Sequence, residues 1–206
     1  SSRSITESGF LIMVHKDTTC FRICKVFNNR GWRFYQNAAL IFEDSRLPEE
    51  NVIRKVADDE VKVGGTDGGD LFGDLELAAN AVGVCEDAVE MASRFAKNTK
   101  IAGRRLFDHQ IVQLKLNEMY MLTEALRSFV LRVAWQHDQG TKSANSGLAM
   151  NFSTDVILRV TRLNLDIHGS GCGRMNARAD KLVRDAMVWS HLAGDTVQRL
   201  KVMQKL

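Results

Sequence analysis

The 206-residue sequence has no hydrophobic run long enough to cross a membrane, although 45% of its residues are hydrophobic. A bilayer-spanning helix needs about 20 consecutive and mostly apolar residues. Charged residues interrupt every apolar run well before that length. We therefore expect no transmembrane segment.

The sequence also lacks an excess of either charge. It has 28 Lys and Arg against 25 Asp and Glu, a net charge of +3, and the two signs are interspersed. Nucleic-acid-binding domains usually concentrate basic residues on one face. The charge balance therefore indicates no nucleic-acid partner. The one aromatic and basic cluster, Trp32–Tyr35, is interpreted as a turn packed on helices.

Cysteine is scarce and scattered. The four cysteines form no Cys-x-x-Cys pair and show no metal-ligand spacing. His168 and Cys172 lie four residues apart across glycines, but two ligands do not complete a metal site. We predict no metal, and scattered thiols of this kind are typical of a reducing compartment.

Up to about Val63 the hydrophobic pattern is typical of β-strands. Phe10–Val14 is nearly all apolar, and Phe21–Val26 alternates with a period of two. Ala38–Phe42 is a third apolar run, and the only proline, Pro48, follows it. Short apolar or alternating runs that end in charged residues or proline predict strands.

From about Asp67 onward, apolar residues recur at steps of three, four and seven, which predicts helices. Glycine-rich stretches at 98–103, 140–147 and 169–173 separate these helices, and a glycine-rich hinge at 64–73 marks the boundary between residues 1–63 and 64–206. The predicted fold class is α+β and mainly α: a partial β domain followed by an up-and-down four-helix bundle. We expect Val112–Trp135 to be its central buried helix, with no strand after Gly103.

The most distinctive motif is a glycine turn that follows a helix. Asp166-Ile167-His168 ends the apolar pattern, and Gly169, Gly171 and Gly173 stop it. Glycines allow positive φ and leave the backbone bare, so a flat or phosphorylated ligand can approach closely. The same glycines are equally compatible with a plain connection between helices.

In combination with its neighbours, this turn resembles the C-terminal helical domain of the acyl-CoA dehydrogenases. That family has a His-Gly-Gly-x-Gly turn, then Lys-Leu-x-Arg-Asp-Ala, then Glu-Gly-Thr. The corresponding residues here are His168-Gly169, Lys181–Ala186 and Gly194. Phe42–Pro48 resembles the end of the family's middle β domain, and Asp108–Gln113 resembles the start of its second long helix.

The resemblance implies FAD as cofactor, an acyl-CoA substrate and a homo- or hetero-oligomer formed through the helical bundle. It also implies a location in the mitochondrial matrix or the bacterial cytoplasm. Dehydrogenation requires a carboxylate base beside the substrate's α carbon. Ala193 occupies the position of the family's catalytic glutamate.

Two other carboxylates are candidates for the base. Glu76 lies near the place where some family members carry it on the first long helix, and Asp195 follows Ala193 by two residues. Each is also compatible with a solvated helix carboxylate or an N-terminal cap.

The positions that contact FAD in the family are only partly kept. Leu106, Gln110 and Gly169 match it and are the predicted cofactor-binding residues. Three other positions depart from the family pattern: Thr99 replaces an arginine, Ala102 a phenylalanine and Asp166 a glutamine. Thr99 removes a bidentate phosphate contact, and the Asp166 carboxylate would repel a diphosphate.

Three functional hypotheses follow from this resemblance. The first is an acyl-CoA dehydrogenase-like flavoprotein, active only within an assembly. The second is a catalytically silent paralogue that serves as a structural or accessory subunit. The third is a flavin monooxygenase of the same fold, which does not require the base glutamate.

Overall fold

The computed structural model describes residues 9–15, 17–56, 71–140, 145–170, 178–192, 199–200 and 203–204. These residues fall into two compact units. The β unit contains the described residues up to Asn29 and from Arg33 to Val56, and the helical unit contains Arg30–Trp32 together with the described residues from Leu71 onward. The predicted domain boundary at 63/64 lies outside the described residues.

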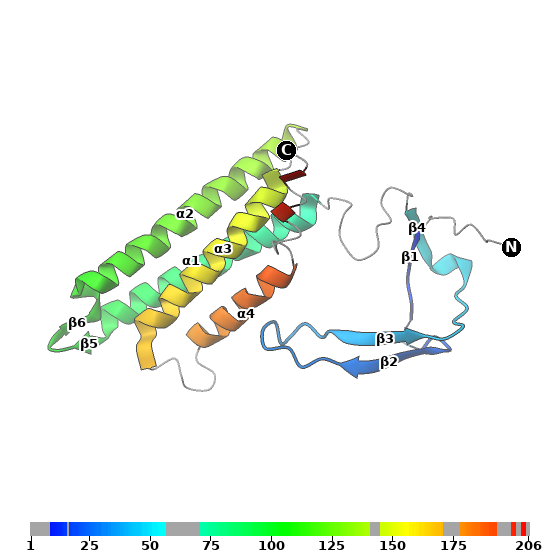
Figure 1. Ribbon diagram of the computed structural model, residues 1–206, viewed down its shortest axis with the longest axis horizontal. Coiled ribbons are helices and arrows are strands. Elements are labelled where there is room, and N and C mark those ends of the chain that lie inside the picture. Colours follow the sequence, from blue (N-terminus) through cyan, green and yellow to red (C-terminus); the bar gives the residue numbers. More distant parts are fainter. Residues whose placement is uncertain are drawn as a thin grey trace. The chain divides into compact units, whose positions relative to one another are not determined.

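The β unit consists of two antiparallel strand pairs (Figure 1). β1 (Gly9–Ile12) pairs with β4 (Val52–Val56), and the short 3-10 helix η1 (Glu49–Asn51) precedes β4. β2 (Phe21–Val26) pairs with β3 (Ala38–Phe42). The bounds of β2 and β3 are those predicted from the sequence.

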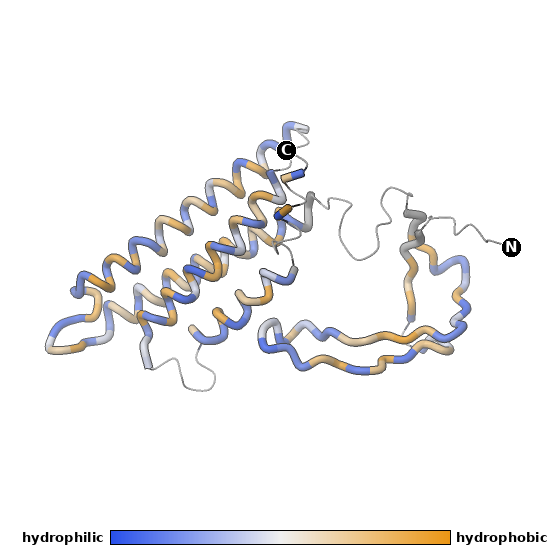
Figure 2. The backbone as a smooth tube through the Cα atoms, viewed as in Figure 1, coloured by the Kyte–Doolittle hydropathy of each residue, from blue (hydrophilic) through white to orange (hydrophobic). Residues whose placement is uncertain are grey.

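The helical unit contains four long helices among its described residues: α1 (Leu71–Asn98), α2 (Gln110–Asp138), α3 (Asn145–His168) and α4 (Arg178–Leu192). Hydrophobic and hydrophilic residues alternate along each of them (Figure 2). This pattern is that of amphipathic helices which bury one face. The predicted fold class is confirmed.

The bundle core is centred on α3 rather than α2. Thirteen of the 24 residues of α3 are buried, against seven of the 29 in α2. The opposite face of α2 is exposed and includes large apolar side chains such as Leu114, Met121 and Trp135. The prediction that Val112–Trp135 is the central buried helix is therefore wrong, because a helix that is apolar on two faces does not bury both within this chain.

Two further details differ from the sequence prediction. A two-residue strand, β6 (Arg104–Arg105), does follow Gly103 and pairs with β5 (Lys100–Ile101) in a hairpin that connects α1 to η2 (Leu106–Asp108) and α2. Ala102 and Gly103 both have positive φ, 51° and 81°, as in a type I′ turn. In addition, Gly147 lies buried within α3 instead of in the preceding loop.

The segment Arg30–Trp32 packs against α4. The Trp32 N–H donates to Asp185 Oδ1 at 2.8 Å, and Arg184 Nη1 donates to the Arg30 carbonyl oxygen at 2.8 Å. The Trp32 ring meets the Trp189 ring edge-on, with centroids 5.0 Å apart. The interpretation of Trp32–Tyr35 as a turn packed on helices is confirmed for Trp32 only, because Phe34 and Tyr35 are exposed.

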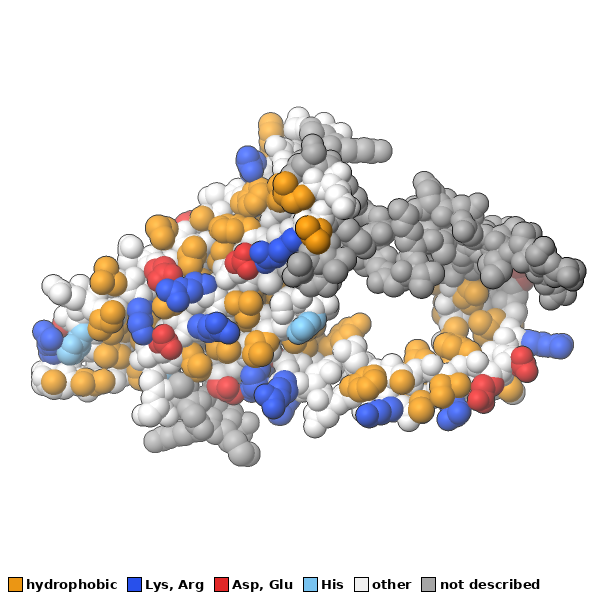
Figure 3. Space-filling model, viewed as in Figure 1, with side chains coloured by type: hydrophobic (Ala, Val, Ile, Leu, Met, Phe, Trp, Pro, Cys, Tyr) orange, Lys and Arg blue, Asp and Glu red, His pale blue; other side chains and the backbone are white. Residues whose placement is uncertain are grey.

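No described helix is both long and apolar enough to cross a membrane. One face of the helical unit shows positive, negative and hydrophobic side chains interspersed (Figure 3).

Candidate functional site

A cavity of about 300 Å³ lies where the end of α1, η2, the start of α2 and the end of α3 come together. It brings together two of the three predicted cofactor-binding residues, Leu106 and Gly169. The third, Gln110, is exposed at the first residue of α2, next to Ile111 in the cavity wall. The remaining lining residues are Phe95, Ile101, Val112, Lys115, Asp166, Ile167, His168 and Ser170.

One wall of the cavity is built from stacked rings. The Phe95 and His168 rings lie 4.3 Å apart at an interplanar angle of 26°. His168 Nδ1 donates to the Asn164 carbonyl oxygen at 2.8 Å, because a carbonyl can only accept. This bond fixes the imidazole against Phe95 and makes a flat ring-lined surface at the end of α3.

The glycine at the mouth of the cavity has the properties predicted for it. Gly169 has φ of +59°, a conformation that residues with a side chain rarely adopt. A Cβ built on it would have no atom within 4 Å. The space on the side-chain side of Gly169 is therefore empty.

Asp166 is paired with a lysine that the sequence analysis missed. Lys115 Nζ lies 3.2 Å from Asp166 Oδ2, and both residues line the cavity. Lys115 is 51 positions from Asp166 in sequence, so no local pattern could reveal the contact. The ion pair offsets the negative charge that we expected to repel a diphosphate.

The residues present fit the adenine end of FAD better than its diphosphate. Apolar walls, a ring-stacked face and an open glycine suit a flat aromatic base. The family's arginine position is Thr99, whose backbone N–H and carbonyl close the start of the hairpin by bonding to Phe95 and Leu106. Ala102 lies in the tight turn of that hairpin.

The candidate bases are not part of this cavity. Glu76 is exposed near the start of α1, 19 residues before Phe95, which corresponds to about 28 Å along a helix. Asp74 is half-buried in the first turn of α1. Asp195 and Ala193 lie outside the described residues.

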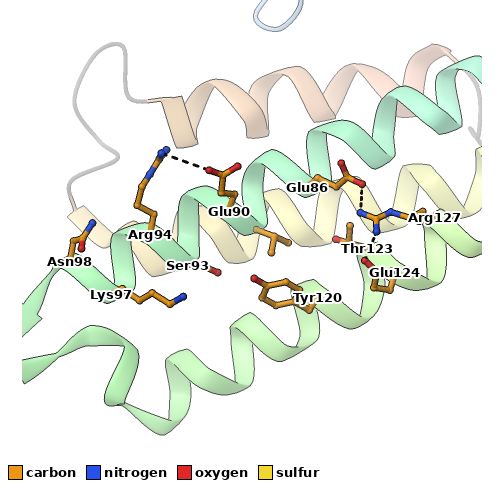
Figure 4. Close-up of a pocket in the computed structure, with 11 residues that line it drawn as sticks. Glu86, Glu90, Ser93, Arg94, Lys97, Asn98, Tyr120, Thr123, Glu124 and Arg127 are labelled. Atoms are coloured by element: carbon orange, nitrogen blue, oxygen red, sulfur yellow. Dashed lines mark hydrogen bonds and ion pairs between the residues drawn. The ribbon is translucent and has the colours of Figure 1, made fainter.

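A larger groove of about 530 Å³ runs between α1 and α2, but it contains none of the predicted site residues (Figure 4). Arg127 reaches across it from α2 to Glu86 on α1 and also contacts Glu124 at 2.9 Å. The hydrogen bond to Glu86 raises the pKa of Arg127. The groove holds three carboxylates and three basic side chains, so its charges are balanced.

No group of three or more potential metal ligands occurs among the residues that the structure describes. Cys172, which the sequence pairs with His168, lies outside those residues.

Comparison with known proteins identifies the family. Residues 73–206 match the model of the acyl-CoA dehydrogenase C-terminal domain. An acyl-CoA dehydrogenase of Bacillus subtilis is 28% identical over 198 residues, covering 94% of this chain and 51% of the relative. An NADH-dependent acryloyl-CoA reductase of Anaerotignum propionicum is 28% identical over 180 residues, covering 86% and 44%.

Solved structures agree on the fold. The butyryl-CoA dehydrogenase of Megasphaera elsdenii superposes with a TM-score of 0.81 at 23% identity, over 94% of this chain and 50% of that one. The chain spans about half the length of the curated relatives and solved structures that it matches. Since the family model covers well over half of its residues, the chain belongs to the acyl-CoA dehydrogenase family.

Proposed function

We propose that the chain is part of an FAD-dependent enzyme that dehydrogenates an acyl-CoA thioester between its α and β carbons. The observation that carries the proposal is the cavity between α1, α2 and α3. It unites Leu106 and Gly169, which are 63 residues apart, beside a ring-stacked wall. A location in the mitochondrial matrix or the bacterial cytoplasm belongs to the same proposal.

The reaction has two parts. A carboxylate removes a proton from the α carbon, and FAD, when bound, accepts a hydride from the β carbon. In this chain Leu106, Gly169 and the Phe95–His168 wall would hold the adenine. Glu76 or Asp195 would take the proton.

The distance between the candidate base Glu76 and the cavity argues for an assembly. Glu76 and the cavity lie about 28 Å apart along α1, so they do not face the same part of one compact cofactor. A second subunit would bring its own cavity to the first subunit's base. The exposed apolar side chains Leu114, Met121 and Trp135 on α2 offer a surface for such a contact.

The test is the flavin spectrum of the purified assembly. We expect a bound flavin whose visible absorbance bleaches when an acyl-CoA is added without oxygen. Glu76→Gln or Asp195→Asn should lower the bleaching rate about a hundredfold or more if that residue is the base. A flavin that binds but does not bleach would overturn the proposal, and a monomer in light scattering would overturn its dependence on assembly.

A catalytically silent accessory subunit is the second candidate, and two observations favour it: Ala193 replaces the usual base, and Glu76 is exposed rather than buried beside a cavity. This hypothesis predicts no bleaching in the unmodified assembly. Ala193→Glu combined with Thr99→Arg should then create both flavin retention and bleaching. Flavin that is reduced only by an external donor and then consumes oxygen would instead indicate the monooxygenase.

A further inference from the structure

An ion pair between Lys115 and Asp166 lies at the rim of the cavity. Lys115 comes from α2 and Asp166 from the last turn of α3, and they meet at 3.2 Å. The Lys115 side chain is 28% exposed, whereas that of Asp166 is 57% exposed. Lysine is therefore the inner member, and the carboxylate faces the opening.

The ion pair leaves Oδ1 of the Asp166 carboxylate available to accept a hydrogen bond. Of the two carboxylate oxygens of Asp166, only Oδ2 has a hydrogen-bond partner among the described residues. A carboxylate accepts hydrogen bonds through both oxygens and donates none when ionised. An amide, by contrast, both donates and accepts.

Resting on the function proposed above, we infer that Asp166 makes this cavity specific for a ligand that presents a hydrogen-bond donor beside its flat base. In adenosine this donor is the 6-amino group or a ribose hydroxyl. Lys115 holds the carboxylate in place and neutralises it. Since its charge is already matched, a phosphate on the ligand gains little from Lys115.

Nucleoside probes separate the two donors. Inosine replaces the 6-amino donor with an oxygen acceptor, and 2′,3′-dideoxyadenosine lacks both ribose hydroxyls. A hydrogen bond to a charged acceptor is worth about tenfold or more in affinity. We therefore expect the 206-residue chain to bind adenosine about tenfold more tightly than the analogue that lacks the donor contacted by Asp166. The affinity for AMP should lie within about threefold of the affinity for adenosine.

The decisive variant is Asp166→Asn, studied by ligand-observed NMR titration of each probe. The amide of this variant can donate to the inosine oxygen as well as accept from the adenosine amino group, and its neutral hydrogen bond to a ribose hydroxyl is weaker than that of a carboxylate. Either discrimination should therefore fall to about twofold, while AMP should gain because Lys115 is released. Asp87→Asn is the matched control, because Asp87 of α1 pairs with Arg178 of α4 at 2.8 Å and neither residue lines the cavity. It should keep the discrimination of the unmodified chain.

The possible failures are distinguishable. Equal binding of adenosine and both analogues, or discrimination that persists in Asp166→Asn, overturns the role of Asp166 and leaves the cavity's function intact. Absence of saturable adenosine binding overturns the assignment of the cavity itself, and the inference falls with it.

Discussion

The helical unit and the β unit contain similar apolar residues but bury them to different extents. Ile157 in α3 is fully buried, whereas Ile23 in β2 is 57% exposed. In β2 only Phe21 is even half-buried, while more than half of α3 is buried. An apolar pattern therefore determines the type of element, whereas the packing around the element determines how much stability that pattern contributes.

The largest expected contrast is in thiol reactivity. Burial, and then the neighbouring negative charge of Glu86, raise the pKa of Cys85 in α1 to about 12. Cys20 and Cys24 of the β unit are exposed. At pH 8 the thiolate population of Cys85 should be about a thousandfold lower than that of an ordinary cysteine.

We therefore expect iodoacetamide to label Cys20 and Cys24 quickly and Cys85 only after unfolding, as measured by peptide mass mapping over time. Urea provides the positive control, because it should make Cys85 react like the others. Rapid labelling of Cys85 in the native protein would show that α1 does not bury it.

A matched pair of isoleucine substitutions tests the same contrast in stability. Ile157→Ala removes a fully buried side chain and should cost about 2–5 kcal/mol of unfolding free energy. Ile23→Ala should cost under about 1 kcal/mol. Urea unfolding followed by circular dichroism measures both, and equal losses would refute the difference between the units.

A glycine pair tests how Arg30–Trp32 packs on α4. A Cβ on Gly31 would lie 2.2 Å from the Arg184 carbonyl oxygen, whereas one on Gly83 in α1 would meet nothing within 4 Å. Gly31→Ala should cost about 1–3 kcal/mol through steric overlap and change the fluorescence of Trp32 and Trp189. Gly83→Ala should instead stabilise α1 by up to about 1 kcal/mol, and a similar loss in both variants would contradict the close packing.

The smallest expected effect is at the hairpin turn. Ala102 holds φ of +51° before Gly103, and Asn-Gly is the pair that such turns prefer. Ala102→Asn should stabilise the helical unit by about 0.5–1 kcal/mol, and Ala102→Val should destabilise it, since β-branched residues avoid positive φ. Thermal melts would give the order of the three melting temperatures. A valine variant that melts above the unmodified chain would exclude the positive φ of the turn at Ala102.

Local pattern predicts most of the secondary structure but not the long-range contacts. The period of two located β2, an apolar run located β3, and the helical period located the long helices, whereas β4 and the β5–β6 hairpin were not predicted. The pattern shows that α2 is apolar on more than one face, but it does not reveal which face is buried in this chain, because the pattern on both faces is alike. The contact of Lys115 with Asp166 joins residues on different helices, as does the packing of Gly31 on Arg184, so neither could be derived from spacing.

The ion pairs between α2 and α3 also favour the observed register of these two helices over a slipped one. Lys115 of α2 meets Asp166 of α3, and Glu118 of α2 meets Arg159 of α3, so the order of charge is reversed from one pair to the next. Sliding one helix along the other until Lys115 faced Arg159, or Glu118 faced Asp166, would place like charges together. The side chains in both pairs are partly exposed, so each pair contributes little stability by itself, but the like charges that a slipped alignment brings together disfavour that alignment.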